Sequence, residues 1–207
     1  MTRRLTVHAQ HPQRRLIRQA AEALRAGGVI AYPTDSAYAL GCALGEAEAL
    51  VTLRRLRGVD EKHHLTLVCS DLSELGRYAR VDNKAFRILK RGVPGPYTFI
   101  LPGTRELPKR ILHPRRSTIG LRVPDHPVVQ ALLAELGAPI LSTTLILPGD
   151  EEPLVDPDEI AQRLPRGLSL LLDAGPCAAR ATTVIDLSEE PFRIVRNAAG
   201  SVAALGL

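Results

Sequence analysis

Residues 29–41 read Val-Ile-Ala-Tyr-Pro-Thr-Asp-Ser-Ala-Tyr-Ala-Leu-Gly, an apolar run followed by a turn rich in polar side chains. The run from Val29 to Tyr32 predicts a buried strand, and Pro33 ends it because proline lacks the N–H that a strand ladder needs. The turn that follows packs hydroxyls, a carboxylate and a phenol together. Loops at strand ends carry function more often than core segments do, so this turn is a candidate ligand site.

Two interpretations of the turn remain open. In the functional one, Thr34 and Ser36 donate hydrogen bonds to an anionic or carbonyl oxygen, and Tyr38 offers a flat face to a ligand. In the structural one, Asp35 bonds its own backbone and only caps the turn. The residues alone favour the structural interpretation, because Pro-Thr-Asp-Ser is common turn chemistry.

Outward from this turn, helix-like and strand-like segments alternate along the chain. Apolar spacing and capping residues predict helices at 13–25, 46–57, 71–78, 82–91 and 127–136, and a helix start at Asp156. Apolar and β-branched runs predict strands at 29–32, 65–69, 97–101, 118–123, 140–144, 168–172, 183–187 and 192–196. The last two strands are joined by a loop short enough for a hairpin. We therefore expect a single α/β domain over residues 1–207, with its core at about 14–201 and flanking helices on a twisted mixed parallel and antiparallel sheet.

The composition excludes several classes of protein. The chain of 207 residues carries a net charge of +5, and its sequence pI of about 9.4 permits a polyanionic partner. No apolar run approaches the length of a membrane span, and the polar N-terminus is not a secretory signal. Cys42, Cys69 and Cys177 are widely spaced without a zinc pattern, so we expect no metal site and reduced thiols in the cytoplasm.

Several segments resemble, in order, the motifs of the YrdC-like family. They are the turn at 33–41, the Pro-Gly-Pro-x-Thr strand at 94–98, the Gly-x-Arg-x-Pro block at 120–124, the strand Thr182-Thr-Val-Ile-Asp186 and the arginine-containing end at 193–196. The match runs from about Arg14 to about Ser201, and linked motifs in the right order make it specific. The sequences of residues 37–42 and 142–144 are similar to those of the YciO branch of the family.

This resemblance implies an α/β fold with a concave basic face and a set of ligand contacts. Synthases of the family convert ATP, L-threonine and bicarbonate to threonylcarbamoyl-adenylate and pyrophosphate, for transfer to adenosine in tRNA. Double-stranded RNA binding is also attributed to the family. The resemblance places substrate or nucleotide contacts at Thr34, Ser36, Tyr38, Arg57, Thr118, Arg122, Ser142, Thr144, Thr182 and Arg196, and no catalytic residue is assigned. ATP is the expected cofactor, and Mg²⁺ is expected only if ATP is used.

The sequence departs from the synthases at two places. Their Lys-x-Arg pair corresponds here to Arg57 and Val59, and their Ser-x-Asn pair corresponds to Thr144 and Ile146. A valine cannot meet a phosphate, and an isoleucine cannot replace an amide. We therefore expect a protein that binds threonine-like, threonylcarbamoyl-like or nucleotide ligands, or acts on the modified tRNA itself, with weak or no synthase activity.

An active L-threonylcarbamoyladenylate synthase remains the alternative, because Lys62, His63 and His64 lie on the same loop and could compensate. For the two histidines, however, a solvated basic turn is favoured over a catalytic role. A third alternative is a basic fold that binds RNA without any ligand pocket. The chain is thus not assigned firmly as an enzyme, and its oligomeric state is not predicted.

Arg122 and the basic clusters supply the last two expectations. Arg122 lies in an apolar strand, where a charge needs a partner or a ligand. The family resemblance implies that the matching arginine holds the substrate carboxylate, which favours contact with a ligand over a structural ion pair. Arg122 should therefore share a positively charged hollow with Thr34. The basic clusters predict RNA or tRNA binding, and the lack of interleaved aromatic residues favours double-stranded or folded RNA. The clusters are Arg3-Arg4, Arg14-Arg15, Arg54-Arg55-Arg57, Lys109-Arg110 and His113-Pro-Arg115-Arg116.

Overall fold

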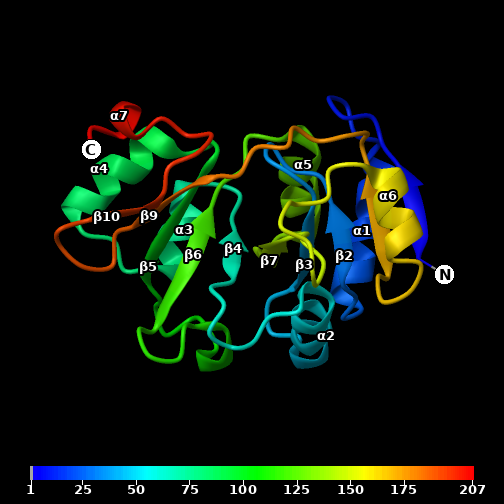
Figure 1. Ribbon diagram of the computed structural model, residues 1–207, viewed down its shortest axis with the longest axis horizontal. Helices are drawn as coiled ribbons and strands as arrows, with labels where there is room; N and C mark the ends of the chain where they lie inside the picture. The colour runs from blue at the N-terminus through cyan, green and yellow to red at the C-terminus, as the bar shows by residue number, and fades with distance from the viewer. Residues whose placement is uncertain (1) are drawn as a thin grey trace.

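One sheet of ten strands organises the computed structural model, which describes residues 2–207 (Figure 1). Across the sheet the strands are β1 (Arg3–Thr6), β8 (Leu170–Asp173), β2 (Ile30–Tyr32), β3 (Ala39–Ala43), β7 (Ile140–Thr144), β4 (Thr66–Val68), β6 (Thr118–Arg122), β5 (Tyr97–Pro102), β9 (Thr183–Asp186) and β10 (Arg193–Arg196). The pairs β1–β8, β2–β8, β4–β6 and β5–β9 are parallel, and the others are antiparallel. The predicted mixed sheet is confirmed, including the closing β9–β10 hairpin.

The helices lie where the apolar spacing and capping residues predict them, within one or two residues at their starts. They are α1 (Arg14–Arg25), α2 (Ala47–Arg57), α3 (Leu72–Tyr78), α4 (Asn83–Gly92), α5 (Pro127–Leu136) and α6 (Pro157–Arg163). Asp71 caps α3 as expected, because its carboxylate accepts a hydrogen bond from the Glu74 N–H at 2.8 Å. A short 3₁₀ helix, η1 (Lys109–Ile111), and the last turn, α7 (Val202–Leu205), were not predicted. Among residues 2–207, no helix is both long enough and apolar enough to cross a bilayer.

Two strands correct the sequence interpretation. The edge strand β1 is mostly exposed, so its residues lack the apolar pattern that would have indicated a strand. Strand β3 begins at Ala39, so the last residues of the predicted turn at 33–41 belong to the sheet. The small residues of β3 carry little strand propensity, and its pairing with both β2 and β7 decides its conformation.

The two faces of the sheet differ in what covers them. Leu67 and Leu121 are cross-strand partners that point into the larger core, which also contains the apolar sides of α2, α3 and α4. The next pair, Thr66 and Gly120, lies on the opposite face because successive side chains of a strand alternate. This opposite face is therefore polar in the middle of the sheet.

Helices α1 and α5 cover the opposite face only in part. They form a second core with residues of β1, β2, β3, β4, β7 and β8, and among the described residues this core takes none from β5, β6, β9 or β10. Figure 1 shows the same division, with α1 and α5 in the half that contains β2 and β7. The covering layer thus stops near the middle of the sheet and leaves a hollow beside it.

Candidate functional site

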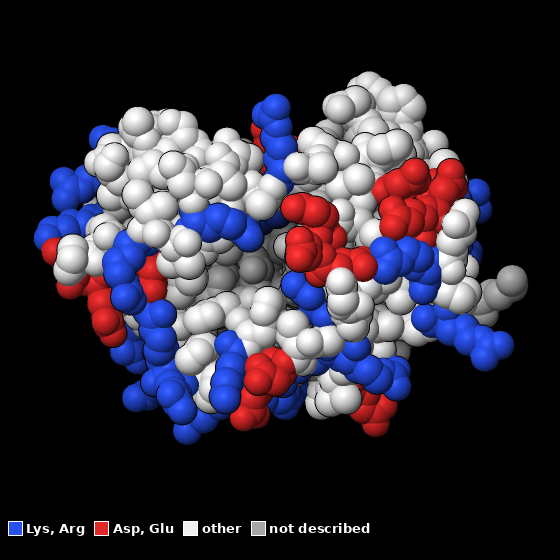
Figure 2. All heavy atoms as spheres, in the orientation of Figure 1, with Lys and Arg blue, Asp and Glu red and all other residues white. Residues whose placement is uncertain are grey.

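A cavity of about 380 Å³ lies in this hollow, which Figure 2 shows near the centre of the molecular face. Its walls come from the turn after β2, from β4 to β7, and from β9 and β10. It brings together most of the residues that the sequence singled out, namely Thr34, Ser36, Tyr38, Arg122, Ser142, Thr144, Thr182 and Arg196. Thr34 and Arg122 both line this cavity, as expected from the sequence. The binding role of these residues stays a prediction.

The turn is held by Thr34. Its hydroxyl accepts hydrogen bonds from the backbone N–H groups of Ser36 at 3.1 Å and Ala37 at 3.3 Å, and it donates to the Ala37 carbonyl at 2.7 Å. The structural interpretation is therefore correct in kind, but Thr34 rather than Asp35 closes the turn. Ser36 is left to face the cavity, where its hydroxyl accepts a hydrogen bond from Arg122 at 3.1 Å.

Arg122 forms a nearly buried ion pair at the end of β6. Its Nη2 contacts the Asp35 carboxylate, and the side chains are only 10% and 14% exposed. Arg122 thus has a structural partner that the sequence did not indicate, because the turn supplies a carboxylate of its own, and its contact with a ligand stays a prediction. The Nε of Arg122 is buried and has no partner among the described residues, so the guanidinium retains a donor for a ligand.

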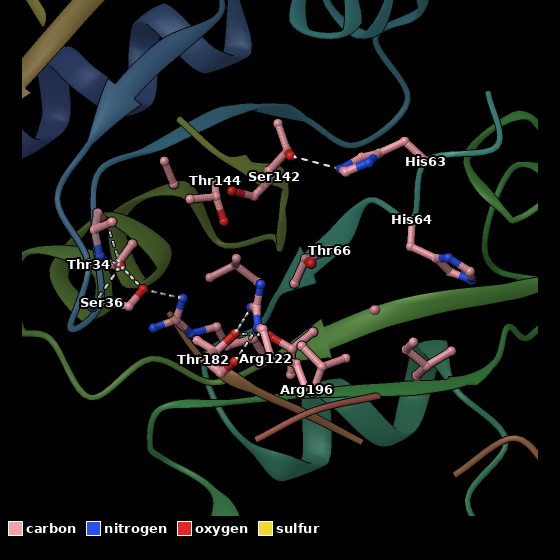
Figure 3. Close-up of a pocket in the computed structure, with 18 of the residues that line it drawn as sticks. Thr34, Ser36, His63, His64, Thr66, Arg122, Ser142, Thr144, Thr182 and Arg196 are labelled. Atoms are coloured by element: carbon pink, nitrogen blue, oxygen red, sulfur yellow. Dashed lines mark hydrogen bonds between the residues drawn. The ribbon is translucent and has the colours of Figure 1, made fainter. Parts of the chain in front are cut away.

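A second guanidinium lies beside the first (Figure 3). Arg196 on β10 donates to the Thr182 carbonyl at 2.8 Å and to the Thr182 hydroxyl at 3.1 Å, which fixes its position. Burial, and then the positive charge of Arg122, lowers the pKa of Arg196. No Asp or Glu of residues 2–207 lines the cavity. The two arginines therefore make this wall attractive to an anionic group.

The opposite wall carries two histidines. His63 lies 3.3 Å from the Thr143 hydroxyl, and His64 lies 3.1 Å from the Thr118 hydroxyl. Burial is the main cause that lowers the pKa of both rings, with Arg57 acting on His63 and His113 on His64. Both rings are accordingly neutral near pH 7. The interpretation of these residues as a solvated turn is wrong, because each is half-buried and lines the cavity.

Three predicted residues take other positions. Arg57 and Thr118 are not among the lining residues, and Thr118 lies buried behind His64. Tyr38 borders the cavity, but its side chain is buried in the larger core and cannot offer a flat face. Its hydroxyl donates to the Gly175 carbonyl at 2.8 Å and accepts from the Ala174 N–H at 3.3 Å. Tyr38 therefore anchors the turn to the end of β8.

Several lining residues escaped the sequence interpretation. Tyr32, Thr66 and Thr98 line the cavity, and the Tyr32 hydroxyl lies 2.7 Å from the Ser142 hydroxyl. Burial raises the pKa of Tyr32 to about 12, so it stays a neutral hydrogen-bonding group. Thr66 and Thr98 each lie between apolar neighbours, and that alternation indicates a half-polar strand. The signal was present, but only the strand order shows that these threonines share a face with Arg122.

The chemistry of the lining limits what can be held there. Within residues 2–207, no group of three or more His, Cys, Asp or Glu side chains is arranged to hold a metal ion. Mg²⁺ prefers oxygen ligands, especially carboxylates and phosphates, and the lining has no carboxylate to offer. The residues therefore do not fit a protein-held Mg²⁺, which could arrive only on the phosphates of a nucleotide.

Comparison with known proteins agrees with this geometry. Residues 22–198 match the family model Sua5_yciO_yrdC, described as "Telomere recombination". The uncharacterized protein YciO of Escherichia coli K12 is 50% identical over 196 residues, which are 95% of each chain. The crystal structure of E. coli YciO superposes with a TM-score of 0.96 at 48% identity, covering 99% of this chain and 100% of that one.

Proteins with a stated activity or ligand are more distant. The human threonylcarbamoyl-AMP synthase is 34% identical over 202 residues, which are 92% of this chain and 71% of that protein. The crystal structure of P. abyssi Sua5 complexed with L-threonine has a TM-score of 0.88 at 25% identity. It covers 95% of this chain and 58% of that one. The human synthase thus resembles this chain in sequence over most of its length.

Proposed function

Because the chain belongs to the Sua5_yciO_yrdC family, in its YciO branch, we propose that it binds a nucleotide in the cavity between the two halves of its sheet. It also binds double-stranded or folded RNA, such as tRNA, and serves threonylcarbamoyladenosine modification. It has weak or no threonylcarbamoyl-AMP synthase activity.

One observation supports this proposal above the others. Arg122 and Arg196 line the same wall of a cavity whose described lining contains no acidic side chain. Guanidinium groups recognise phosphate and carboxylate with paired hydrogen bonds, and a cavity of about 380 Å³ suits a small molecule. The opposite wall offers neutral rings and hydroxyls, which suit the uncharged part of a nucleoside.

The weak synthase activity follows from the replaced residues. Val59 and Ile146 stand where the synthases carry a cation and an amide, and neither lines the cavity. Adenylate formation develops negative charge on the leaving pyrophosphate, so a missing cation acts on the transition state. One lost charge-assisted contact costs about 1.5–3 kcal/mol, or roughly tenfold to a hundredfold in rate.

The alternative is an active synthase that uses ATP, L-threonine and bicarbonate. Lys62 favours it, because this cation lines the cavity on the loop that has lost the usual one. P. abyssi Sua5 was solved with L-threonine, so a threonine-like group is a reasonable second ligand of this cavity. If ATP is the substrate, Mg²⁺ accompanies its phosphates.

The test measures binding and turnover on the same protein. We expect AMP or ATP to raise the melting temperature of the wild-type protein, since a ligand that binds only the native state stabilises it. Arg196→Ala should lose at least tenfold in nucleotide affinity, whereas Arg15→Ala on the exposed face of α1 should match wild type. Arg122→Lys, which keeps the buried charge, should also bind more weakly.

Turnover is followed as pyrophosphate release that requires both threonine and bicarbonate. We expect release close to the background without enzyme, and an increase when Arg57→Lys, Val59→Arg and Ile146→Asn are combined. Robust release by the wild-type protein, abolished by Arg122→Ala, would establish the alternative. Absence of any nucleotide-induced shift would overturn the proposal.

A further inference from the structure

We propose that a second cavity, lined by Arg80, Arg105 and Lys109, binds the phosphate backbone of the RNA next to the nucleotide held in the first cavity. This inference rests on the RNA-binding part of the proposed function. It adds a site on the loop between β5 and β6 and defines the ligand as a nucleotide within an RNA chain.

The second cavity has about 520 Å³, which is larger than the first. It is lined by Arg80, Gly103, Thr104, Arg105, Leu107, Lys109, Leu112, His113, Pro114 and Ser117. Its polar lining consists of cations, hydroxyls and one imidazole, and no described acidic side chain takes part. Three cations without an acidic neighbour in the described lining suit a ligand with several phosphates, such as an RNA backbone.

The cations of this cavity are unpaired, unlike many others on the protein. Among residues 2–207, Arg80, Arg105 and Lys109 form no ion pair and no side-chain hydrogen bond. By contrast, Arg4 of the predicted N-terminal cluster contacts both Asp158 and Asp173. The three cations of this cavity are therefore free to meet an anion. Figure 2 shows Lys and Arg side chains gathered below and to the left of the central hollow.

The two cavities share a wall. His64 lines the first and His113 lines the second, and their rings stack with centroids 4.5 Å apart. Ligands on the two sides of this wall would thus lie close enough to be neighbouring parts of one chain. The Nδ1 of His113 is buried and has no partner among the described residues, so the wall keeps a polar atom for a ligand or a bound water.

The loop that carries His113 is firmly held. Arg116 contacts the Asp186 carboxylate at 2.5 Å and the Ser188 hydroxyl at 2.8 Å, which ties the loop to the β9 end. Ser117 has a φ of 52°, and it is the non-glycine residue with positive φ among those described. Strain of this kind persists only where the surroundings enforce it, and it concentrates at functional sites.

Charge and shape together favour folded RNA. The cations come from three places, after α3, after β5 and in η1, and the fold brings them to one cavity. Contacts of this kind read the phosphate backbone and are independent of sequence. No Phe, Tyr or Trp of residues 2–207 lines the second cavity, and the one ring there, that of His113, already stacks on His64, so stacking on unpaired bases contributes little.

The experiment compares two triple variants that remove the same charge. Arg80→Ala, Arg105→Ala and Lys109→Ala are combined in the site variant. Arg18→Ala, Lys90→Ala and Arg166→Ala, all exposed, without ion pairs and outside the predicted RNA-binding clusters, form the control. Binding of fluorescently labelled tRNA is measured by anisotropy from low to moderate salt. AMP affinity is measured in parallel as a readout of the first cavity.

We expect the site variant to lose at least tenfold in tRNA affinity and to bind AMP like wild type. Its plot of log affinity against log salt should become shallower by about 2, since each lost phosphate contact removes about 0.7 to 0.9 of slope. The control variant should change far less on both measures.

Equal loss in the two variants would overturn the second site while leaving the nucleotide proposal intact. Loss of inorganic pyrophosphate binding by the site variant, with tRNA binding unchanged, would also overturn it, since the site would then take only small anions. A wild-type protein that binds AMP but not tRNA would refute the RNA part of both proposals.

Discussion

Arg122 shows how one residue can serve both the fold and the site. It contacts Asp35 and Ser36 of the turn while lining the cavity, and its side chain is 10% exposed. The turn thus offers Arg122 a carboxylate of the kind that a ligand would bring. A ligand carboxylate or phosphate would compete with Asp35 or bind the unpartnered Nε.

This arrangement predicts a strong dependence of stability on the pair. Arg122→Ala should lower the free energy of unfolding by about 3 kcal/mol, because it leaves the Asp35 carboxylate desolvated without a partner. Adding Asp35→Asn to Arg122→Met should recover most of that loss, since the double variant buries no charge. Urea denaturation of the single and double variants measures both effects. Additive losses in the double variant would contradict the pairing.

The surroundings of His63 and His64 depend on residues that are distant in the sequence. A run of Lys62, His63 and His64 on a loop looks like a solvated basic turn. In the structure each ring meets a strand hydroxyl, and burial lowers the pKa of both. Their neighbours come from β6 and β7, far along the chain, so no local pattern could have indicated them.

At the scale of elements, strand β6 forms the floor of the cavity. Gly120 lies there between Thr66 and Thr98, and a Cβ at Gly120 would come within 2.9 Å of the Thr66 hydroxyl and 3.1 Å of the Leu65 carbonyl. Because Gly120 has no side chain, the space above β6 stays open as part of the cavity. The strand thus contributes both the arginine that recognises an anion and the space for the ligand.

Gly120→Ala is therefore expected to damage the cavity and the sheet together. We expect a loss of about 1–3 kcal/mol in the free energy of unfolding, because the added methyl group would crowd the Thr66 hydroxyl and the backbone carbonyl of Leu65. Nucleotide affinity should fall at least tenfold. Gly76→Ala in α3 is the matched control, since a Cβ there meets nothing within 4 Å. Thermal melts and nucleotide titrations of both variants measure these effects, and full affinity in Gly120→Ala would contradict this role of the floor.

At the scale of the whole molecule, the cavity lies where the two halves of the sheet meet. The turn at Thr34–Ala37 and strand β7 belong to one half, and β5, β9 and β10 belong to the other. A backbone hydrogen bond also links the turn to the segment that leads into β9. In it, the Arg180 N–H donates to the Ser36 carbonyl at 3.3 Å. A ligand in the cavity would therefore contact both halves at once.

Ligand binding should accordingly protect both halves from hydrogen exchange. With saturating AMP, we expect slower amide exchange in the turn at 34–37 and in β9 and β10, because local opening of either half would break ligand contacts. Mass spectrometry of peptides from wild-type protein and from Arg196→Ala would show this. Protection confined to one half would contradict a bridging ligand.

Local sequence patterns predict the helices, most of the strands and the polar composition of the turn at 33–41. Helices, their caps and most strands follow from local spacing. Family motifs identified the residues of the arginine wall. These patterns lie within short segments, so they can be recognised before the fold is known.

Which side chains meet depends on how distant strands pair in the folded protein. Strand order places β4, β6 and β5 side by side, and that register aligns Thr66 with Gly120 and gives Arg122 its partner in Asp35. The same packing buries the ring of Tyr38 and draws His64 against His113. Pairing between distant strands depends on the collective burial of both faces of a sheet, and no local stretch of sequence encodes it.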